Sequence, residues 1–153
     1  MLADVKNAIE GGLPTMAECG GFMYLFGQME DMEGKAYPVA GVIPGKAYYT
    51  GKLTRFGYVS LTERTGTLSG AAQRNMSMSG TVRAHEFHYY DTTDNGDAFL
   101  AEKPMSSRAW NCMHLRGNLM AGFPHLYYYS NPEIAENFLD LCRDHREKRT
   151  GKA

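Results

Sequence analysis

The sequence predicts an α/β fold, because a buried strand, a sharp glycine turn and a helix follow one another near the N-terminus. Residues 13–17 form a short apolar run, Glu18-Cys19-Gly20-Gly21 interrupts it, and Phe22, Met23, Leu25 and Phe26 return to helical spacing. β-branched and aromatic segments follow, and an amphipathic helix is predicted near the C-terminus. Strands mixed with helices in this way are typical of sheets that carry helices on their faces.

Length and composition exclude several classes of protein. The 153 residues suffice for one domain with its own core, and 43% hydrophobic against 22% charged residues excludes a disordered or fibrous chain. A formal charge of -1 provides no field that would attract nucleic acid or an anionic membrane, and no segment reaches the length of a membrane span. We therefore expect neither nucleic acid nor a membrane as a partner.

The cysteines indicate the compartment. Cys19, Cys112 and Cys142 are odd in number and widely spaced, so they suggest neither a disulfide framework nor a tetrahedral zinc site. No basic region followed by an apolar run opens the chain. We expect a cytoplasmic protein with no metal site.

The elements at the start of the chain are predicted from apolar spacing. Leu2, Val5, Ala8 and Ile9 indicate a helix that stops at Gly11-Gly12, and the second apolar helix is expected to end near Gly27. Residues 37–61 are interpreted as strands joined by tight turns, and polar residues 62–80 as an exposed loop with a mobile tip.

Later elements are predicted in the same way. Residues 81–90 are strand-like, Asn95-Gly96 is a turn signal, and residues 119–129 form a last strand region. Ser130-Asn131-Pro132-Glu133 predicts a helix start with a capping side chain. The buried stripe of that helix is predicted to be Ile134, Phe138, Leu141 and Cys142.

Cys19 is a candidate nucleophile. Between a buried strand and a helix N-terminus, unpaired backbone N–H groups are expected to lower the pKa of the thiol and favour the thiolate. Gly20 and Gly21 leave room for a substrate carbonyl, and the Gly20 N–H can face the oxyanion that forms on attack. The alternative is that Cys19 is only a small buried hydrophobic residue.

A cysteine nucleophile needs a base, and the chain offers His85, His88, His114, His125 and His145. His145 falls in the charged C-terminal helix, and His114 in a stretch without a clear pattern. His125 lies in a strand-like aromatic segment and is the first choice, since open α/β sheets present reactive groups at strand ends. A histidine that merely packs among aromatic residues is the alternative.

The segment from His85 to His88 does not match the zinc-protease motif, because its histidines are three positions apart rather than four. In a strand, Glu86 and His88 share one face, while His85, Phe87 and Tyr89 share the other. Glu86 and His88 could orient a substrate or tune the base; the alternative is a surface ion pair. Residues 41–47 have the wrong spacing for a phosphate loop, so no ATP site is expected.

These segments together resemble the C-terminal glutamine amidotransferase domain of cobyrinic acid a,c-diamide synthase, an enzyme of cobalamin biosynthesis. The resemblance covers residues 1 to about 140 and is carried mainly by Ala-Glu-Cys-Gly-Gly at 17–21 and His-Glu-Phe-His-Tyr at 85–89. It implies a class I amidotransferase fold with a flavodoxin-like, open, mostly parallel sheet flanked by helices. On that basis residues 1–142 would form a partial, N-terminally truncated amidotransferase domain, and 143–153 a basic helix end and solvated tail.

The resemblance also implies roles for residues. Cys19 would be the nucleophile and His125 the general base, while Gly20 and Gly21 would line the oxyanion and substrate site together with Glu86, His88 and Tyr127. Glutamine would be hydrolysed through a thioester, and the ammonia would pass to a corrin carboxylate activated by ATP and Mg²⁺ in a synthetase domain or subunit. No cofactor is expected in this chain, and a homodimer is left open.

The chain departs from the family pattern in ways that matter for function. Tyr127 stands where class I amidotransferases commonly have a glutamate, two residues after the base, so Glu86 or Tyr127 is hypothesised to assist a Cys-His dyad. Ala84 replaces a usual glycine, and the family's first strands and second oxyanion loop precede the matched region. The alternatives are therefore a catalytically silent docking module or the glutaminase of a related tetrapyrrole amidotransferase.

Overall fold

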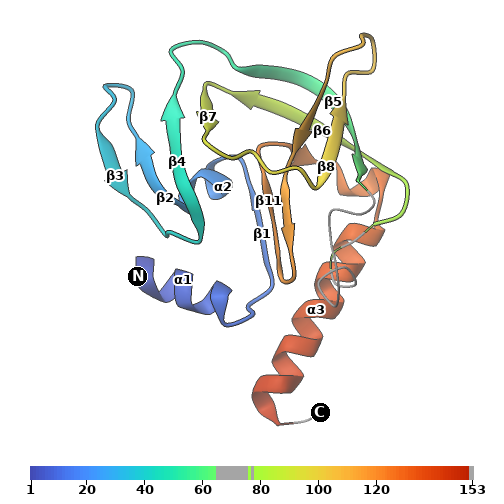
Figure 1. Cartoon of the computed structure of the whole chain (residues 1–153). Coiled ribbons are helices and arrows are strands. Elements are labelled where there is room, and N and C mark those ends of the chain that lie inside the picture. The colour runs from blue at the N-terminus through green and yellow to red at the C-terminus, as the bar shows by residue number, and fades with distance from the viewer. Residues whose placement is uncertain (65–75, 77, 152–153) are drawn as a thin grey trace.

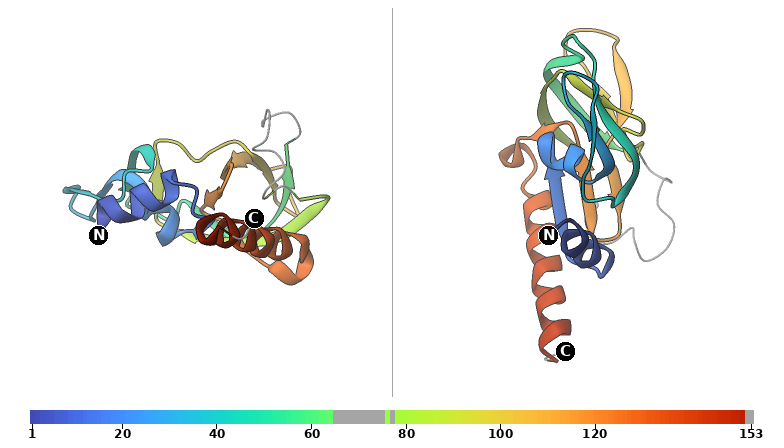
Figure 2. Two further views of the ribbon diagram at one scale, coloured as in Figure 1. Left: turned by 90° about the horizontal axis from the view of Figure 1, so that it is seen from below. Right: turned by 90° about the vertical axis from the view of Figure 1, so that its left-hand side faces the viewer.

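The computed structural model describes residues 1–64, 76 and 78–151 of the chain. Three β-sheets lie side by side, with two longer helices on the flanks of the central sheet (Figure 1). Two views from other directions show that helix α3 runs away from the strands toward the C-terminus (Figure 2).

The central sheet contains the strand that leads to Cys19. It has the order β1 (Thr15–Glu18), β11 (Leu119–Gly122) and β10 (His114–Arg116). β1 and β11 are parallel, and Glu18 is the register partner of Gly122. The ends of these two strands therefore reach the same edge of the sheet, although they lie more than a hundred residues apart in sequence.

A second sheet follows directly from the short helix α2 (Gly20–Tyr24). Its order is β3 (Ala36–Pro38), β2 (Phe26–Glu30), β4 (Ile43–Tyr49) and β7 (Tyr90–Thr92). β2 pairs with β4 in parallel, and the other pairs are antiparallel. Phe26 belongs to strand β2 and not to the helix that the apolar spacing predicts, because α2 ends after a little more than one turn.

The third sheet is antiparallel throughout its described strands. Its order is β12 (His125–Leu126), β6 (Thr81–His88), β5 (Arg55–Glu63), β8 (Phe99–Glu102) and β9 (Ala109–Cys112). Burial alternates along β6, so that Val82, Ala84, Glu86 and His88 face inward. The predicted separation of Glu86 and His88 from His85 and Phe87 is confirmed.

The α/β class is confirmed, but the expectation of a mostly parallel sheet needs correction. Among the strands that the structure describes, parallel pairing is limited to β1 with β11 and β2 with β4. Part of the physical reason is the connections: a short turn such as residues 117–118 between β10 and β11 can only reverse the chain direction, whereas a parallel pair needs a longer crossover.

The helices at the two ends cover the central sheet. α1 (Leu2–Glu10) places Ile9 in a core with Phe22, Phe26 and Phe123, while α3 (Glu133–Thr150) places Ile134 and Leu141 in a second core with the third sheet. α3 continues through residue 143 to Thr150, and most of residues 143–150 are exposed.

Two further predictions are corrected at the borders of α3 and of the polar loop. Pro132 is the N-cap of α3 and no side chain caps it, because the Asn131 amide instead donates to the Ser79 carbonyl at 2.9 Å. Most of the exposed loop predicted for residues 62–80, namely residues 65–75 and 77, lies outside the described residues. Within the rest of that segment, Met76 and Met78 are buried rather than exposed.

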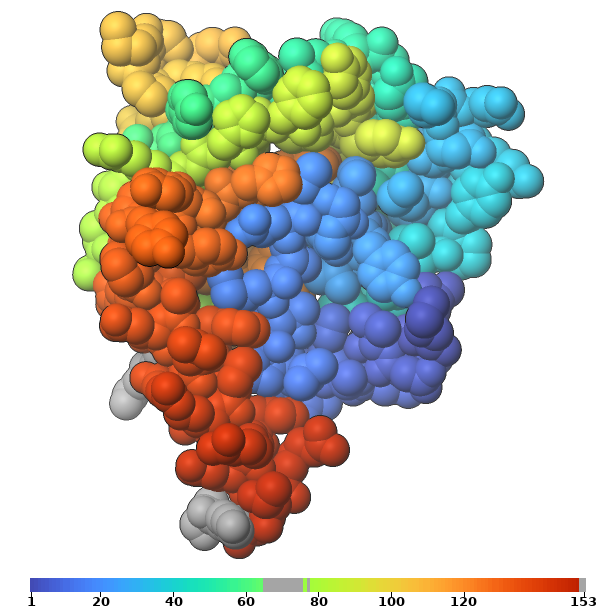
Figure 3. Space-filling view, turned by 180° about the vertical axis from the view of Figure 1, so that it is seen from behind, coloured from blue at the N-terminus to red at the C-terminus, as the bar shows by residue number. Residues whose placement is uncertain are grey.

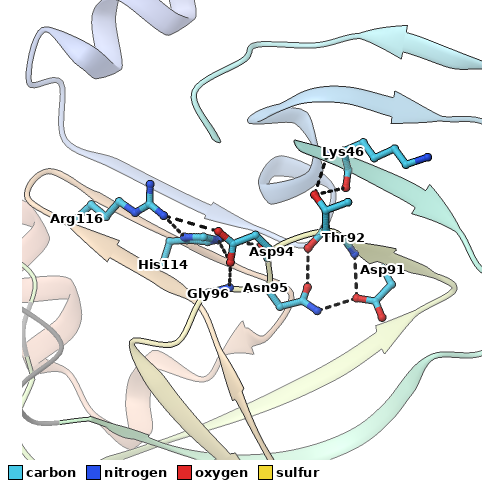
Figure 4. Close-up of polar contacts among 9 residues, drawn as sticks. Lys46, Asp91, Thr92, Asp94, Asn95, Gly96, His114 and Arg116 are labelled. Carbon is cyan, nitrogen blue, oxygen red and sulfur yellow. Dashed lines mark hydrogen bonds and ion pairs between the residues drawn. The ribbon is translucent and has the colours of Figure 1, made fainter. Parts of the chain in front are cut away.

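A polar network fixes the loop that follows β7 (Figure 4). The Asp91 carboxylate accepts hydrogen bonds from the Thr92 N–H at 2.9 Å and from the Asn95 amide at 2.7 Å. The Thr93 N–H donates to the Lys46 carbonyl at 3.0 Å, which attaches the loop to β4. These contacts hold the loop to itself and to the neighbouring strand β4.

Candidate active site

Cys19 lies on a sharp bend between β1 and α2. Its backbone dihedrals are φ 49° and ψ -106°, a conformation that residues other than glycine rarely adopt. Hydrogen bonds hold the bend on both sides: the Cys19 N–H donates to the Gly122 carbonyl at 2.8 Å, and the Met23 N–H donates to the Cys19 carbonyl at 3.0 Å. This strand, strained residue and helix arrangement resembles a nucleophile elbow.

The electrostatics of Cys19 differ from the sequence expectation. Burial is the largest effect and raises the pKa of the thiol above its ordinary value of 9.0, and the Glu18 and Glu86 carboxylates raise it further. A backbone hydrogen bond from Gly20 lowers the pKa of Cys19 but does not overcome the burial. The predicted lowering of the Cys19 pKa is therefore wrong. Helix α2 is short, and the loss of hydration at the half-buried sulfur raises the pKa more than the hydrogen bond at the bend lowers it.

The glycines after Cys19 are not required by packing. A Cβ placed on Gly20 would meet no atom within 4 Å, and one on Gly21 would meet only the Ala17 Cβ at 3.7 Å. Both glycines are exposed. In a helix, alanine is favoured over glycine by about 1 kcal/mol, so the fold alone would favour a side chain at Gly20.

His125 approaches the same end of the central sheet from β12. It follows Gly122 by three residues, and Gly122 is both the register partner of Glu18 and the acceptor for the Cys19 N–H. The space-filling view from behind shows the early segment, in blue, adjoining the segment around residues 120–130, in orange (Figure 3). The topology thus brings the candidate nucleophile and the candidate base to one region.

The His125 ring lies against the carboxylate of Glu18, the residue directly before Cys19. Oε2 of Glu18 lies 3.6 Å from Nδ1 of His125. The other oxygen, Oε1, accepts a hydrogen bond from the Tyr128 hydroxyl at 2.5 Å and one from the Leu126 N–H at 3.3 Å. Burial raises the pKa of Tyr128 above its ordinary range, and its bond to Glu18 adds to that effect.

Glu86 and His88 are buried at 1% and 5% exposure, which rules out a surface ion pair. Their closest atoms, Oε1 and Nε2, are 3.8 Å apart, beyond hydrogen-bond range. The His88 ring stacks on Phe123 with centroids 3.8 Å apart, and its Nδ1 lies 2.7 Å from the Tyr90 carbonyl. Within the described part of the chain, Oε2 of Glu86 and Nε2 of His88 have no hydrogen-bond partner.

Glu86 and His125 lie on different faces of the third sheet. His125 is the register partner of His85, and directly opposed residues of an antiparallel pair share a face, so His125 shares the face of His85 and not that of Glu86. The structure therefore does not bring Glu86 to His125, although Glu86 remains close enough to raise the pKa of Cys19.

Tyr127 is exposed beside His125. Its N–H donates to the Arg83 carbonyl at 2.8 Å, and its ring lies 5.9 Å from that of Tyr129. Tyr127 and His125 line a hollow of about 820 Å³ on the open face of the third sheet, together with Tyr58, Arg83, His85 and Pro104 among others. The contact at Nδ1 of His125 comes from Glu18 rather than from Tyr127.

The other histidines lie apart from this region or serve packing. His114 is buried, with Nε2 at 3.0 Å from the Asp94 carbonyl and Nδ1 at 3.1 Å from Nη2 of Arg116 (Figure 4). His145 lies on the largely exposed C-terminal part of α3. His85 makes edge contacts with the rings of Phe56 and Tyr58 on the open sheet face.

Sequence reasoning missed two residues of this site, Glu18 and Tyr128. Glu18 could have been noticed, since a carboxylate is unusual at the end of a short apolar run directly before a candidate nucleophile. Nothing in the sequence around Tyr128 distinguishes it from Tyr127 and Tyr129, because its partner lies 110 positions away.

The described residues contain no group of three or more His, Cys, Asp or Glu side chains that could hold a metal ion. Among the same residues there is no helix with the length and apolar character needed to cross a bilayer.

Comparison with known proteins agrees with the geometry. The Caldanaerobacter subterraneus subsp. tengcongensis protein named cobyrinate a,c-diamide synthase is 34% identical over 93% of this chain and 30% of its own length. Proteins of the same name from Priestia megaterium and Listeria innocua are 34% and 36% identical, over 95% and 88% of this chain and 32% and 29% of theirs. The chain thus spans about three tenths of the length of these relatives.

A family model for the CobB/CobQ-like glutamine amidotransferase domain matches residues 1–132, which include the Cys19 bend and His125. With a match over most of its length, the chain belongs to the CobB/CobQ-like glutamine amidotransferase domain family.

Proposed function

We propose that this chain is the glutaminase portion of a cobyrinate a,c-diamide synthase, in which it hydrolyses glutamine to supply ammonia. The family assignment supports the glutamine amidotransferase chemistry, and the relatives' names support the choice of cobyrinate as the acceptor. The observation that carries the proposal is the strained Cys19 bend, whose edge of the sheet also receives His125.

The proposed reaction begins with the Cys19 thiol. Because burial keeps the pKa of Cys19 high, the sulfur needs a base to take its proton as it attacks the side-chain amide of glutamine. His125 accepts that proton, and a carbon–sulfur bond forms while the amide carbonyl becomes an oxyanion. Collapse of this intermediate breaks the carbon–nitrogen bond, and the proton on His125 passes to the departing ammonia.

Water then completes the cycle. His125 takes a proton from water as the hydroxide adds to the thioester, and the sulfur leaves, taking a proton back to regenerate the thiol. The sum is glutamine plus water giving glutamate plus ammonia. The open space at Gly20 and Gly21 supports this assignment, since it leaves room for the substrate amide beside the sulfur.

The acceptor chemistry is assigned to the part of the synthase that this chain does not span. An ATP-binding synthetase domain or subunit would activate the corrinoid carboxylate with ATP and Mg²⁺ and would receive the ammonia. The relatives are about three times as long as the matched region, which supports such a partner. A cytoplasmic location and a homodimer remain predictions.

An electrophilic glutamine analogue tests the proposal. Wild-type protein is incubated with the analogue, its intact mass is measured, and the modified residue is located by peptide mapping. We expect one adduct on Cys19 that free glutamine suppresses by competition, and no adduct in Cys19→Ala. Cys142→Ala, which removes another half-buried thiol, is the matched control and should still be labelled. Labelling elsewhere, or none, would favour a catalytically silent docking module.

A further inference from the structure

The pair of contacts on the Glu18 carboxylate points to a role for this residue, and the inference rests on the proposed function. We propose that Glu18 is the positioning residue of the base: its Oε2 holds the proton of His125 on Nδ1, and Tyr128 fixes the carboxylate in place. Glu18 thereby replaces the glutamate that would otherwise stand two residues after the base, where this chain has Tyr127.

The two oxygens of the Glu18 carboxylate have different partners. Oε1 is occupied by the Tyr128 hydroxyl at 2.5 Å and the Leu126 N–H at 3.3 Å. Both groups can only donate here, because the raised pKa of Tyr128 keeps its phenol protonated. Oε2 is the oxygen that remains. It lies 3.6 Å from Nδ1 of His125, just beyond hydrogen-bond range, so in this structure it acts on the ring through its charge.

The second step concerns the ring of His125. A carboxylate oxygen has only lone pairs to offer, so the neutral ring is favoured with its proton on Nδ1. Nε2 then carries the free lone pair that the Cys19 thiol proton requires. When Nε2 accepts that proton, the ring becomes positive, and the contact with Glu18 is expected to shorten into a charge-assisted hydrogen bond.

Other charged or titratable groups around His125 do not provide this contact. From β6, His85 and Arg83 line the same hollow, and Tyr58 of β5 and Tyr127 complete the titratable lining. Arg83 would repel an imidazolium, and neither His85 nor the two tyrosines can supply the negative charge of a carboxylate. Among the ion pairs of the described residues, that of His125 is with Glu18.

Glu18→Gln provides a sharp test, because the amide is expected to have one orientation. The Tyr128 hydroxyl and Leu126 N–H both need an acceptor, so the glutamine oxygen should take the place of Oε1. The NH₂ group then takes the place of Oε2 and faces Nδ1. A donor at that place moves the ring proton to Nε2, where it blocks transfer from the thiol.

The expected result is a change of tautomer with a loss of rate. The ¹⁵N chemical shifts of His125 should report the proton on Nδ1 in wild type and on Nε2 in Glu18→Gln. Labelling of Cys19 by the glutamine analogue should slow by about 10²- to 10⁴-fold, the contribution of a general base. This loss should outweigh the lower pKa of Cys19 that follows from removal of the Glu18 charge. Glu33→Gln, which changes an exposed glutamate, should leave both readouts unchanged.

A double variant keeps the proposal falsifiable if Glu18→Gln weakens the fold. In Glu18→Gln with Tyr128→Phe, the amide loses the donor that fixes it and can turn its oxygen toward Nδ1, so part of the Nδ1 tautomer and of the labelling rate should return. A proton that stays on Nδ1 in Glu18→Gln, or a double variant slower than the single one, would overturn the proposal. The His125 tautomer is measured without turnover, so a wrong tautomer refutes the role of Glu18 alone. Failure of the analogue to label Cys19 in wild type would instead refute the proposed glutaminase function.

Discussion

Glu18 and Tyr128 lie 110 positions apart in the chain and are joined by a 2.5 Å hydrogen bond from the tyrosine hydroxyl to Oε1 of the glutamate. The bond connects strand β1, which ends at Glu18 directly before Cys19, with the 3-10 turn η2 (Tyr128–Ser130) that follows His125. Two distant segments of the candidate site are thus held together by one polar contact, and this contact should contribute to stability as well as to geometry.

Tyr128→Phe should lower the free energy of unfolding by about 1 to 2 kcal/mol, because it removes a partly buried hydrogen bond to a charged acceptor. Chemical denaturation at pH 7 measures the change. Tyr129→Phe is the matched control, since Tyr129 is 87% exposed, and should have little effect. Equal stability of the two variants would mean that the Glu18 contact contributes nothing.

Gly20→Ala should separate stability from activity. The added methyl group meets no atom of the protein and replaces glycine in a helix, so the free energy of unfolding should rise by up to about 1 kcal/mol. The same methyl group occupies the space proposed for the substrate amide, so labelling of Cys19 by the glutamine analogue should slow. Thermal unfolding and labelling rate are measured on the same sample.

Gly122→Ala is the control for Gly20→Ala, because at Gly122 an added methyl group has no room. Its Cβ would lie 2.5 Å from the Met113 Cγ and 3.1 Å from the Met113 Cα, so the substitution should destabilise the protein by about 1 to 3 kcal/mol. If Gly20→Ala proved as destabilising as Gly122→Ala, or were labelled at the wild-type rate, the space beside Cys19 would have no role in substrate binding.

Glu86→Gln should move the pH dependence of Cys19 labelling toward lower pH. The negative charge of Glu86 is one of the influences that raise the pKa of Cys19, so its removal lowers the pH at which the thiolate forms. The labelling rate with a small, uncharged alkylating reagent, measured from pH 6 to 10, detects the shift. The profile of Glu33→Gln should match wild type, and a Glu86→Gln profile that also matches would contradict the electrostatic link.

Cys112→Ala should reduce the fall in the free energy of unfolding that occurs as the pH rises above 9. Burial, with a smaller contribution from Glu86, raises the pKa of the Cys112 thiol from 9.0 to about 12 in the folded protein. Between these values the unfolded chain releases the proton while the folded chain keeps it, so the unfolding free energy falls as pH rises, by up to about 1.4 kcal/mol per pH unit.

The comparison for Cys112 uses urea unfolding under reducing conditions across that pH range. Wild type should lose more stability than Cys112→Ala above pH 9, whereas the difference between them should be constant at neutral pH, where both states keep the thiol proton. Parallel curves over the whole range would show that the buried thiol is not responsible.

Local patterns account for the parts of the fold that the sequence predicted. The helix at Leu2–Glu10, the bend at Cys19 and the alternation along Thr81–His88 each depend on neighbouring residues, and each is confirmed. The extent of parallel pairing was predicted wrongly, because strand direction depends on connections and on long-range pairing that no short window of sequence contains.

The same distinction applies to the site. Cys19 stands out locally because glycines follow it, whereas Glu18 became visible only through Tyr128, Leu126 and His125, all more than a hundred positions later. The raised pKa of Cys19 was also beyond sequence reasoning, since burial of the sulfur depends on tertiary packing and outweighs the effect of the bend.

The most direct test of the central claim is to trap the covalent intermediate with the natural substrate. Protein is mixed with isotopically labelled glutamine, the reaction is stopped with acid within its first turnover, and the peptides are analysed by mass spectrometry. The account predicts a labelled glutamyl thioester on Cys19, absent from Cys19→Ala and strongly reduced in Glu18→Gln. Glutamate production with no acyl group on Cys19, or an acyl group on another residue, would contradict it.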